Sequence, residues 1–192
     1  MYCGTGGGLI WTFKQKIVSL NISSYEYFGS SVSLSGNLMV VGAYGDPFDP
    51  SGSSMGAAYI FITTDNGSTW TITQKIVPMD READGNFGYY YSVAISGNVV
   101  LIGERNDGTN DEGAAYIFTT LDNGYTWVET NKLVASDTDT NDKFGRGTSL
   151  SSEYAVVGGL QNDDGGIDTG SAYVFPKLLK VSTTSDISFA NE

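Results

Sequence analysis

The chain has 192 residues, of which 10 are Lys or Arg and 22 are Asp or Glu, so its formal net charge is −12. A charge of this sign and size repels nucleic acid and anionic membrane surfaces, and no apolar run is long enough for direct membrane insertion. Histidine is absent and Cys3 is the single cysteine, which excludes an internal disulfide, a histidine general base and the commonest zinc ligand.

An eight-residue string that begins with Trp predicts the first strand of the chain. It reads Trp-Thr-Phe-Lys-Gln-Lys-Ile-Val at residues 11–18, and similar strings return at residues 70–77 and 127–134. Because side chains alternate along a strand, every second residue from Trp70 to Ile76 is expected on one face. All three strings carry a lysine in the same register: Lys16, Lys75 and Lys132. A lysine there suits an outer strand that must not pair with foreign strands.

A Phe-Gly pair follows each string after a polar loop, at residues 28–29, 87–88 and 144–145. Each pair opens a strand with aliphatic residues on one face and Ser, Ala or Thr on the other, at residues 31–35, 92–96 and 148–151. Small side chains of this kind suit a crowded strand near a central axis. The second copy has two extra residues among Tyr89, Tyr90 and Tyr91, which we expect to form a bulge.

Two further strands are expected in each unit. Continuously apolar runs at residues 38–43, 99–103 and 155–158 predict a strand that neighbouring sheets cover on both faces. Acidic, glycine-rich loops then lead to Gly-Ala-Ala-Tyr-Ile-Phe at 56–61 and 113–118, and to Gly-Ser-Ala-Tyr-Val-Phe at 170–175. The opening glycines of these strands are 57 residues apart both times, from 56 to 113 and from 113 to 170.

Short strands that repeat at this period predict an all-β fold made of β-propeller blades. Each blade is expected to hold four antiparallel strands, and the chain holds about three repeats, so the propeller is partial or is completed by an oligomer. A flat or solenoidal array of the same units is the alternative. Residues 1–18 are expected to end a preceding blade, with blade 1 at 19–77, blade 2 at 78–134, and blade 3 with a C-terminal tail at 135–192.

A tight turn is expected between the third and fourth strands of the first two units. The sequences are Thr-Thr-Asp-Asn-Gly-Ser-Thr-Trp at 63–70 and Thr-Leu-Asp-Asn-Gly-Tyr-Thr-Trp at 120–127. Asn-Gly favours a hairpin turn because both residues accept positive φ, and the Thr and Asp side chains can hold backbone N–H groups. The residues expected to build these turns are Thr63, Asp65, Gly67, Trp70, Thr120, Asp122, Gly124 and Trp127.

The repeat resembles the FG-GAP family, the propeller repeat also present in integrin α-chains. The residues that carry the resemblance are Phe28-Gly29 with Val41-Gly42-Ala43, Phe87-Gly88 with Ile102-Gly103-Glu104, and Phe144-Gly145 with Val157-Gly158-Gly159. With the Gly-Ala-Ala strands, the resemblance covers about residues 11–176. The turn before each Trp looks like an Asp-box, a structural turn known from sialidases and other propellers. The third repeat lacks this turn, since Phe175 is followed directly by Pro176.

The resemblance implies a non-catalytic binding or scaffold module, extracellular or on a cell surface, with a protein or glycan as its ligand. Contacts are expected from the acidic loops, from the loops before each Phe-Gly pair and from Tyr89–Tyr91. Neither catalytic residues nor a resident cofactor are expected. The Asp-box likeness leaves a sialidase-like glycoside hydrolase as a less favoured alternative. That chemistry needs an arginine cluster, and the arginines of the chain are Arg81, Arg105 and Arg146.

A calcium-stabilised structural or adhesion repeat is another alternative. Integrin-type repeats often carry an Asp-x-Asp-x-Asp-Gly calcium loop, but its places hold Ser35-Gly36-Asn37, Ser96-Gly97-Asn98 and Ser152-Glu153-Tyr154. Residues 137–142 offer oxygens at alternate positions, as calcium loops do, with Asp137, Asp139 and Asn141 as candidate ligands. This segment lacks the glycine at position six and the late bidentate glutamate, so a solvated acidic loop is the competing interpretation.

Three ways of completing the array remain open, because propellers have at least about four blades. The chain is a piece of a longer propeller, or residues 11–18 complete the third unit to give three blades that close by pairing with a second chain, or residues 181–189 supply a strand of their own. Self-association or further blades are therefore expected. The first eight residues have neither the basic nor the apolar region of a signal peptide, so none is expected there.

Overall fold

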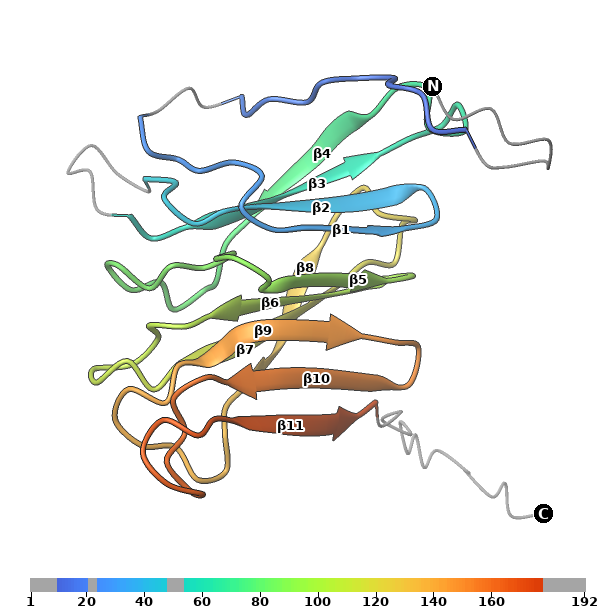
Figure 1. Cartoon of the computed structure of the whole chain (residues 1–192). Coiled ribbons are helices and arrows are strands. Elements are labelled where there is room, and N and C mark those ends of the chain that lie inside the picture. The colour runs from blue at the N-terminus through green and yellow to red at the C-terminus, as the bar shows by residue number, and fades with distance from the viewer. Residues whose placement is uncertain (1–9, 21–23, 48–53, 178–192) are drawn as a thin grey trace, which may run out of the picture.

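The computed structural model describes residues 10–20, 24–47 and 54–177, and this part of the chain folds into three antiparallel sheets (Figure 1). Blade 1 has the order β1-β2-β3-β4, made of β1 Val32–Ser35, β2 Leu38–Ala43, β3 Ala57–Ile62 and β4 Thr71–Ile76. Blade 2 has the order β5-β6-β7-β8, made of β5 Val93–Ser96, β6 Val99–Glu104, β7 Ala114–Thr119 and β8 Val128–Leu133. Blade 3 has the order β11-β10-β9, made of β9 Phe144–Leu150, β10 Tyr154–Gly159 and β11 Ser171–Pro176.

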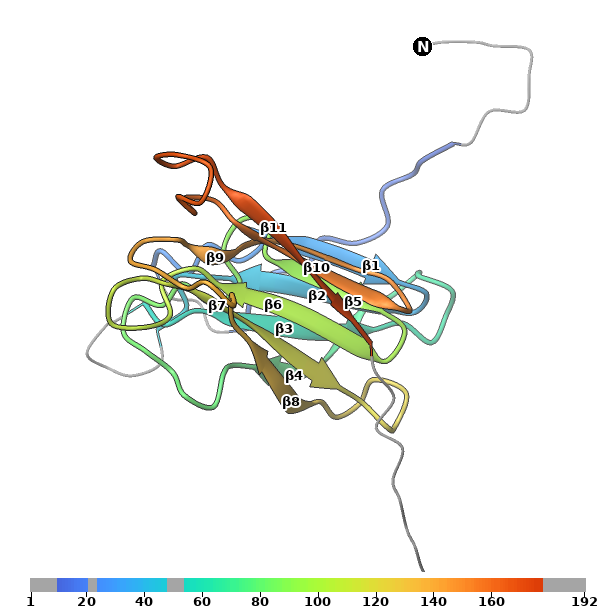
Figure 2. The same ribbon diagram turned by 90° about the horizontal axis from the view of Figure 1, so that it is seen from below.

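The prediction of an all-β fold with propeller-like blades is confirmed. No helix occurs in the described ranges, and so none that could span a membrane. The three blades lie one above another in Figure 1 and do not close into a ring. Their first strands are neighbours, because β1 contacts β5 and β5 contacts β9. Figure 2 shows β4 and β8 together at the opposite edge of the array.

Serine hydroxyls join the first strands of blades 1 and 2. They accept hydrogen bonds from backbone N–H groups, Ser31 from Val93 at 3.2 Å, Ser33 from Ile95 at 3.2 Å and Ser35 from Gly97 at 3.1 Å. The small residues expected on these crowded strands therefore have a second role besides their small size. They satisfy N–H groups along the edge of β5 that have no neighbouring strand within their own sheet.

Apolar side chains fill the space between neighbouring blades. Val40, Ile60 and Val100 are fully buried between blades 1 and 2, and Leu101 and Val157 are fully buried between blades 2 and 3. Each such side chain contributes roughly 1.5–3 kcal/mol of hydrophobic free energy. As the apolar runs predicted, nearly all of β2 and all of β6 are buried, whereas β10 alternates because no sheet covers its outer side.

The fourth strand of blade 1 contains a β-bulge. The register shifts between Ile60 and Phe61 of β3, which leaves Thr73 as an extra residue on β4. As a result, Ile72 packs on the side of blade 1 that faces away from blade 2, whereas Ile76 lies in the core between the two blades. The prediction that alternate residues of this strand share one face is wrong, because the bulge reverses the alternation.

Residues 10–20 form no strand, so the strand predicted at 11–18 is wrong. The segment nevertheless lies along blade 1, where the side chain of Gln15 accepts the Trp70 N–H at 2.7 Å and donates to the Trp70 carbonyl at 3.3 Å. Gln74 of β4 makes the same two hydrogen bonds to Trp127, at 2.7 and 3.0 Å. The N-terminal segment therefore lies against blade 1 as β4 lies against blade 2. Within residues 10–20, 24–47 and 54–177, however, no strand lies beside it to form a ladder.

The two extra residues of blade 2 form a turn rather than a bulge within the strand. Gly103 accepts the N–H of Gly88 at 3.1 Å and donates its own N–H to Ser92 at 2.8 Å. Within residues 88–92, the Ser92 N–H donates to the Tyr89 carbonyl at 3.1 Å, and Tyr91 has a φ of 64°. The turn thus pushes three consecutive tyrosines out of the sheet.

Candidate functional site

Two sets of loops meet at one end of the array, which we call the loop face. One set leads into each Phe-Gly pair, and the other connects the second strand of each blade with the third. Figure 1 shows both sets on its left side, and the turns at residues 63–70 and 120–127 on its right side. Loops that a rigid scaffold brings together are the usual place for binding residues.

Four tyrosine rings form a continuous cluster on the loop face across blades 1 and 2. Tyr27 stacks on Tyr44, with ring centroids 4.7 Å apart and planes at 3°. Tyr44 also contacts Tyr89 at 4.6 Å and Tyr90 at 5.4 Å, and the latter two rings are 4.9 Å apart. Tyr27 and Tyr90 keep 48 % and 38 % of their surface exposed, so one side of the cluster faces solvent. Burial and the neighbouring Tyr90 raise the pKa of Tyr44, so its hydroxyl is neutral at physiological pH.

Two guanidinium groups lie against this cluster. The guanidinium carbon of Arg105 is 4.1 Å from the ring centroid of Tyr89, and that of Arg146 is 4.8 Å from the same ring. Arg146 also donates to the Tyr90 carbonyl at 3.4 Å, whereas the buried Nε of Arg105 has no hydrogen-bond partner among the described residues. In a chain with a net charge of −12, this pairing creates a local positive site framed by aromatic rings.

We call Tyr27, Tyr44, Tyr89, Tyr90, Arg105 and Arg146 the tyrosine–arginine cluster. The sequence pointed to Tyr89–Tyr91 but not to Tyr27 or Tyr44, because their stacking depends on how the first two blades pack. Of the three arginines expected for a sialidase-like site, Arg105 and Arg146 come together. Arg81 lies elsewhere, where its Nε donates to the Pro78 carbonyl at 3.3 Å.

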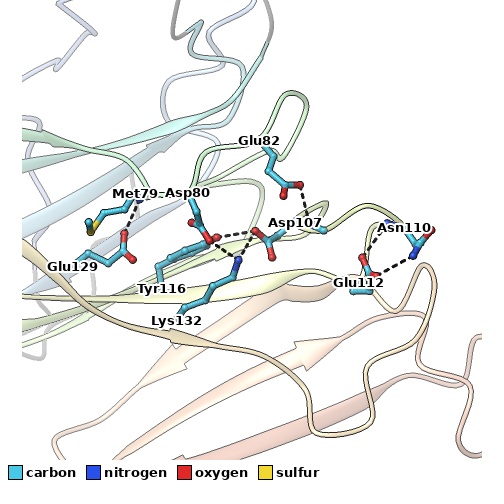
Figure 3. Close-up of polar contacts among 10 residues, drawn as sticks. Met79, Asp80, Glu82, Asp107, Asn110, Glu112, Tyr116, Glu129 and Lys132 are labelled. Carbon is cyan, nitrogen blue, oxygen red and sulfur yellow. Dashed lines mark hydrogen bonds and ion pairs between the residues drawn. The ribbon is translucent and has the colours of Figure 1, made fainter.

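A lysine, a tyrosine and two aspartates meet at the same end of blade 2. The Tyr116 hydroxyl donates to Asp107 at 2.8 Å, and Lys132 lies 2.8 Å from Asp107 and 2.7 Å from Asp80 (Figure 3). Burial raises the pKa of Tyr116 well above its ordinary value, with the nearby acids adding to the effect. The group holds β7, β8 and two loops together.

Blade 1 repeats this arrangement with Lys75 and Asp46, which are 2.5 Å apart, and the Tyr59 hydroxyl bonds to the same carboxylate. The repeated lysine was interpreted as protection for a strand edge. The structure shows that in β4 and β8 it neutralises an aspartate of the loop between the second and third strands. Sequence reasoning missed this role, although the common register of lysine, tyrosine and aspartate in two repeats was visible.

Blade 3 has a different version of this group. Asn162 stands where the other blades have aspartate, and its side chain donates to the Tyr173 hydroxyl at 3.1 Å. Tyr173 donates to Asp137 at 2.8 Å. A hydrogen bond to Asp137 raises the pKa of Asp164 above its ordinary value. Within the described ranges no lysine reaches these acids, because blade 3 has no fourth strand.

Blades 1 and 2 also place one buried carboxylate each behind this group. In blade 2 it is Glu104, fully buried at the end of β6, and neither carboxylate oxygen has a hydrogen-bond partner among the described residues. Burial, together with the charge of Asp107, raises its pKa to about 8. A side chain at Gly85 would overlap the Glu104 carboxylate. In blade 1 the position of Gly85 holds the buried Glu26, 2.9 Å from the Tyr59 hydroxyl.

The two turns at the opposite end share the hydrogen bonds that their Thr and Asp side chains make. In the first turn, the Thr63 hydroxyl accepts the Gly67 N–H at 2.9 Å, and Asp65 accepts the N–H of Thr69 at 2.8 Å. Thr120, Gly124 and Asp122 repeat these contacts, and the Trp127 ring N–H donates to the Gly124 carbonyl at 3.0 Å. Hydrogen bonds from Thr69 and Thr126 lower the pKa of Asp65 and Asp122 to about 2.

Each of the three candidate calcium ligands makes a hydrogen bond within the chain. Asp137 accepts the Tyr173 hydroxyl, and Asp139 accepts the Thr140 N–H at 2.6 Å. Asn141 has a φ of 65°, and its N–H bonds to the Asn110 carbonyl at 2.9 Å. Across residues 10–20, 24–47 and 54–177, no three Asp, Glu, Cys or His side chains are grouped as a metal ion requires.

Comparison with known families gives one match. The FG-GAP repeat matches three times, at residues 11–61, 70–118 and 127–175. Each matched segment begins at the Trp of an eight-residue string and ends at the Phe of a Gly-Ala-Ala-type strand. No curated protein matches the sequence.

Proposed function

The chain belongs to the FG-GAP repeat family, and from this premise we propose that it is a non-catalytic module that binds a protein or glycan at its loop face. The tyrosine–arginine cluster is the observation that carries the proposal. Tyr and Arg are the side chains that most often dominate the binding energy of protein interfaces. Their rings offer apolar area at low entropic cost, and their guanidinium groups favour a ligand that carries a carboxylate.

The positive character of this site supports an acidic ligand. The chain has 22 acidic and 10 basic residues, so its net charge repels an acidic partner, whereas Arg105 and Arg146 attract one locally. The guanidinium group of Arg105 lies on the ring of Tyr89, 4.1 Å from its centroid, and adds to the positive charge of this site. An acidic peptide segment and a glycan with a carboxylated sugar share this chemistry, and the binding experiment separates them.

We expect Arg146→Ala and Tyr90→Ala to weaken ligand binding about tenfold each, because each removes a contact at the centre of the cluster. The probes are an array of glycans with and without carboxylated sugars, and a displayed library of acidic and neutral peptides. The Kd of each selected ligand is then measured by biolayer interferometry. Tyr125→Ala is the matched control, since Tyr125 is 53 % exposed but lies at the opposite end of blade 2.

Selected ligands that tolerate Arg146→Ala, or that lose as much affinity with Tyr125→Ala, would refute a binding site at the cluster. Selection from the glycan array alone identifies a glycan ligand, and selection from the peptide library alone identifies a protein ligand. If neither library yields a ligand dependent on the cluster, the binding proposal fails.

Metal-independent stability is part of the proposal. We expect the Tm to change by less than about 1 °C between 2 mM calcium and a chelator, because Asp137 and Asp139 already accept hydrogen bonds within the chain. Differential scanning calorimetry checks this result. A rise of several degrees that disappears in Asp139→Asn would instead favour the calcium-stabilised repeat with Asp137, Asp139 and Asn141 as ligands.

We further propose that the module works outside the cell or on its surface. The resemblance to integrin-type repeats supports this location. Protection of the chain from an added protease on intact cells, with digestion only after lysis, would contradict it.

A further inference from the structure

Neighbouring blades meet in the same way twice within the chain, once between blades 1 and 2 and once between blades 2 and 3. At each internal interface, the Phe-Gly pair of one blade lies against the preceding blade, at the end of its second strand and the start of its third. Phe87 forms a parallel bridge with Gly56 and donates its N–H to the Met55 carbonyl at 3.2 Å. Phe144 forms the same bridge with Gly113 and donates to the Glu112 carbonyl at 2.9 Å.

Glycines mark where the two sides of this interface touch. At Gly42 and Gly103, an added methyl group would overlap the carbonyl oxygens of Gly88 and Gly145 in the next blade. Gly158 holds the same position in blade 3, but its nearest neighbour is 3.8 Å away, in its own sheet. The sequence of blade 3 therefore keeps a glycine that its own neighbours do not require.

The outer side of blade 3 has a cavity where the internal interfaces hold a Phe-Gly pair. Its volume is about 620 Å³, and its lining includes Gly158, Gly159, Gly170, Ser171 and Ala172. These are the blade 3 counterparts of the residues that surround Phe87-Gly88 and Phe144-Gly145. At the other end of the array, Phe28-Gly29 is the pair that no blade receives, and nothing lies within 4 Å of a methyl group placed on Gly29.

Exposed apolar residues on blade 3 match buried ones in blade 1. Tyr154 and Val174 are 50 % and 62 % exposed on the outer side. Their counterparts Leu38 and Ile60 are 5 % and 0 % exposed, because blade 2 covers them. The outer side of blade 3 therefore has the composition of an interior face.

The N-terminal segment has the sequence of the fourth strand that blade 3 lacks. Gln15 is bonded to Trp70 as Gln74 of β4 is bonded to Trp127, so residues 11–18 lie where the fourth strand of a preceding blade would lie. Ile17 packs against blade 1 as Ile76 packs against blade 2. Trp11 is 92 % exposed, whereas its counterpart Trp127 is 3 % exposed.

Charge also fits between the segment and blade 3. Tyr59 pairs with Lys75 across β3 and β4, and Tyr116 pairs with Lys132 across β7 and β8. The same register places Lys16 opposite Tyr173. There the ammonium group would meet Asp137 and its neighbour Asp164, the acids that no lysine of the described chain reaches.

We propose that two copies of this chain close head to tail into one six-bladed propeller. Residues 11–18 of each copy form the fourth strand beside β11 of the other, and Phe28-Gly29 of each copy enters the cavity on blade 3 of the other. Propellers typically have four to eight blades, and six is the only multiple of three in this range. Two identical contacts related by a two-fold axis cover the outer face of each terminal blade and leave only the short, protected sheet edges of a propeller.

The first test is the mass in solution by light scattering. The wild-type chain is expected at twice its 20.5 kDa mass. Lys16→Glu and Gly158→Ala are each expected to lower dimer affinity at least a hundredfold while leaving the circular-dichroism spectrum unchanged. Lys14→Glu is the matched control: it makes the same charge change at an exposed neighbour and leaves the dimer intact.

The second test fixes the register in a Cys3→Ser background. Internal pairs join Ile60 with Gln74 and Ile117 with Asn131, so Gln15→Cys with Val174→Cys is expected to form a disulfide between copies. Gln15→Cys with Tyr125→Cys is the control that should not cross-link. A monomeric wild type, a mass that grows with concentration as an open filament would, or a disulfide within one copy would overturn the proposal. A monomer would mean that blades from another chain complete the ring.

Discussion

Glu104→Gln is expected to raise the free energy of unfolding at pH 7 by about 3 kcal/mol and to leave it nearly unchanged at pH 4. Glu104 is fully buried, and burial with the charge of Asp107 raises its pKa from 4.5 to about 8. Between these two values the folded protein binds a proton that the unfolded chain releases. The stability of the wild type therefore falls as the pH rises from about 4.5 to about 8, and glutamine removes this dependence.

Urea unfolding at pH 4, 5.5, 7 and 8, followed by tryptophan fluorescence, measures the effect. Glu153→Gln is the control, because Glu153 is exposed in the turn between β9 and β10. The free energy of unfolding should fall with rising pH in the wild type and in the Glu153→Gln variant. In the Glu104→Gln variant this fall should be absent. Parallel pH profiles for Glu104→Gln and the wild type would show that the Glu104 carboxylate ionises at its ordinary pKa.

Gly103→Ala is expected to destabilise the chain by about 3 kcal/mol or more, whereas Gly158→Ala should cost less than about 0.5 kcal/mol in the monomer. A methyl group at residue 103 would overlap the Gly145 carbonyl oxygen, a backbone atom of blade 3. Blades 2 and 3 would then have to move apart and lose packing between their sheets. At residue 158 the nearest atom is 3.8 Å away, which is ordinary van der Waals contact.

Chemical denaturation in a Lys16→Glu background separates this effect from self-association. The two substitutions add the same methyl group at the same position of two repeats, so their difference reports on the neighbouring blade alone. Equal losses for Gly103→Ala and Gly158→Ala would show that the substitution acts on the strand itself and not on the contact between blades.

Local patterns were sufficient to predict the strands that pair within a blade. The apolar runs of β2 and β6 and the Gly-Ala-Ala motif of β3 and β7 each predict their strand, because burial on both faces leaves a clear trace in the sequence. The bulge at Thr73 leaves none. A bulge depends on the register with a neighbouring strand, which alternation along one strand does not encode.

Features between blades were harder to predict. Residues 11–18 have the sequence of β4, yet they form no strand, because a strand needs a partner and the described part of the chain offers none at that place. The stacking of Tyr27 on Tyr44 and the two guanidinium groups at Tyr89 likewise depend on contacts between loops of different blades. The lysines were visible, but their aspartate partners lie 25 and 29 residues away in the chain.

The buried carboxylates bear on how the repeats diverged. Blade 1 supplies its carboxylate from the loop, with Glu26 opposite Ala43, whereas blade 2 supplies it from the strand, with Glu104 opposite Gly85. Both partners of each pair lie within one repeat, so duplication of a repeat copies a working pair. A change from one arrangement to the other by single substitutions passes through a repeat with two crowded acids or with none. Chimeras that exchange half a repeat between blades 1 and 2 should therefore fail to fold, because they carry two crowded acids or none. Chimeras that exchange a whole repeat should keep the pair intact.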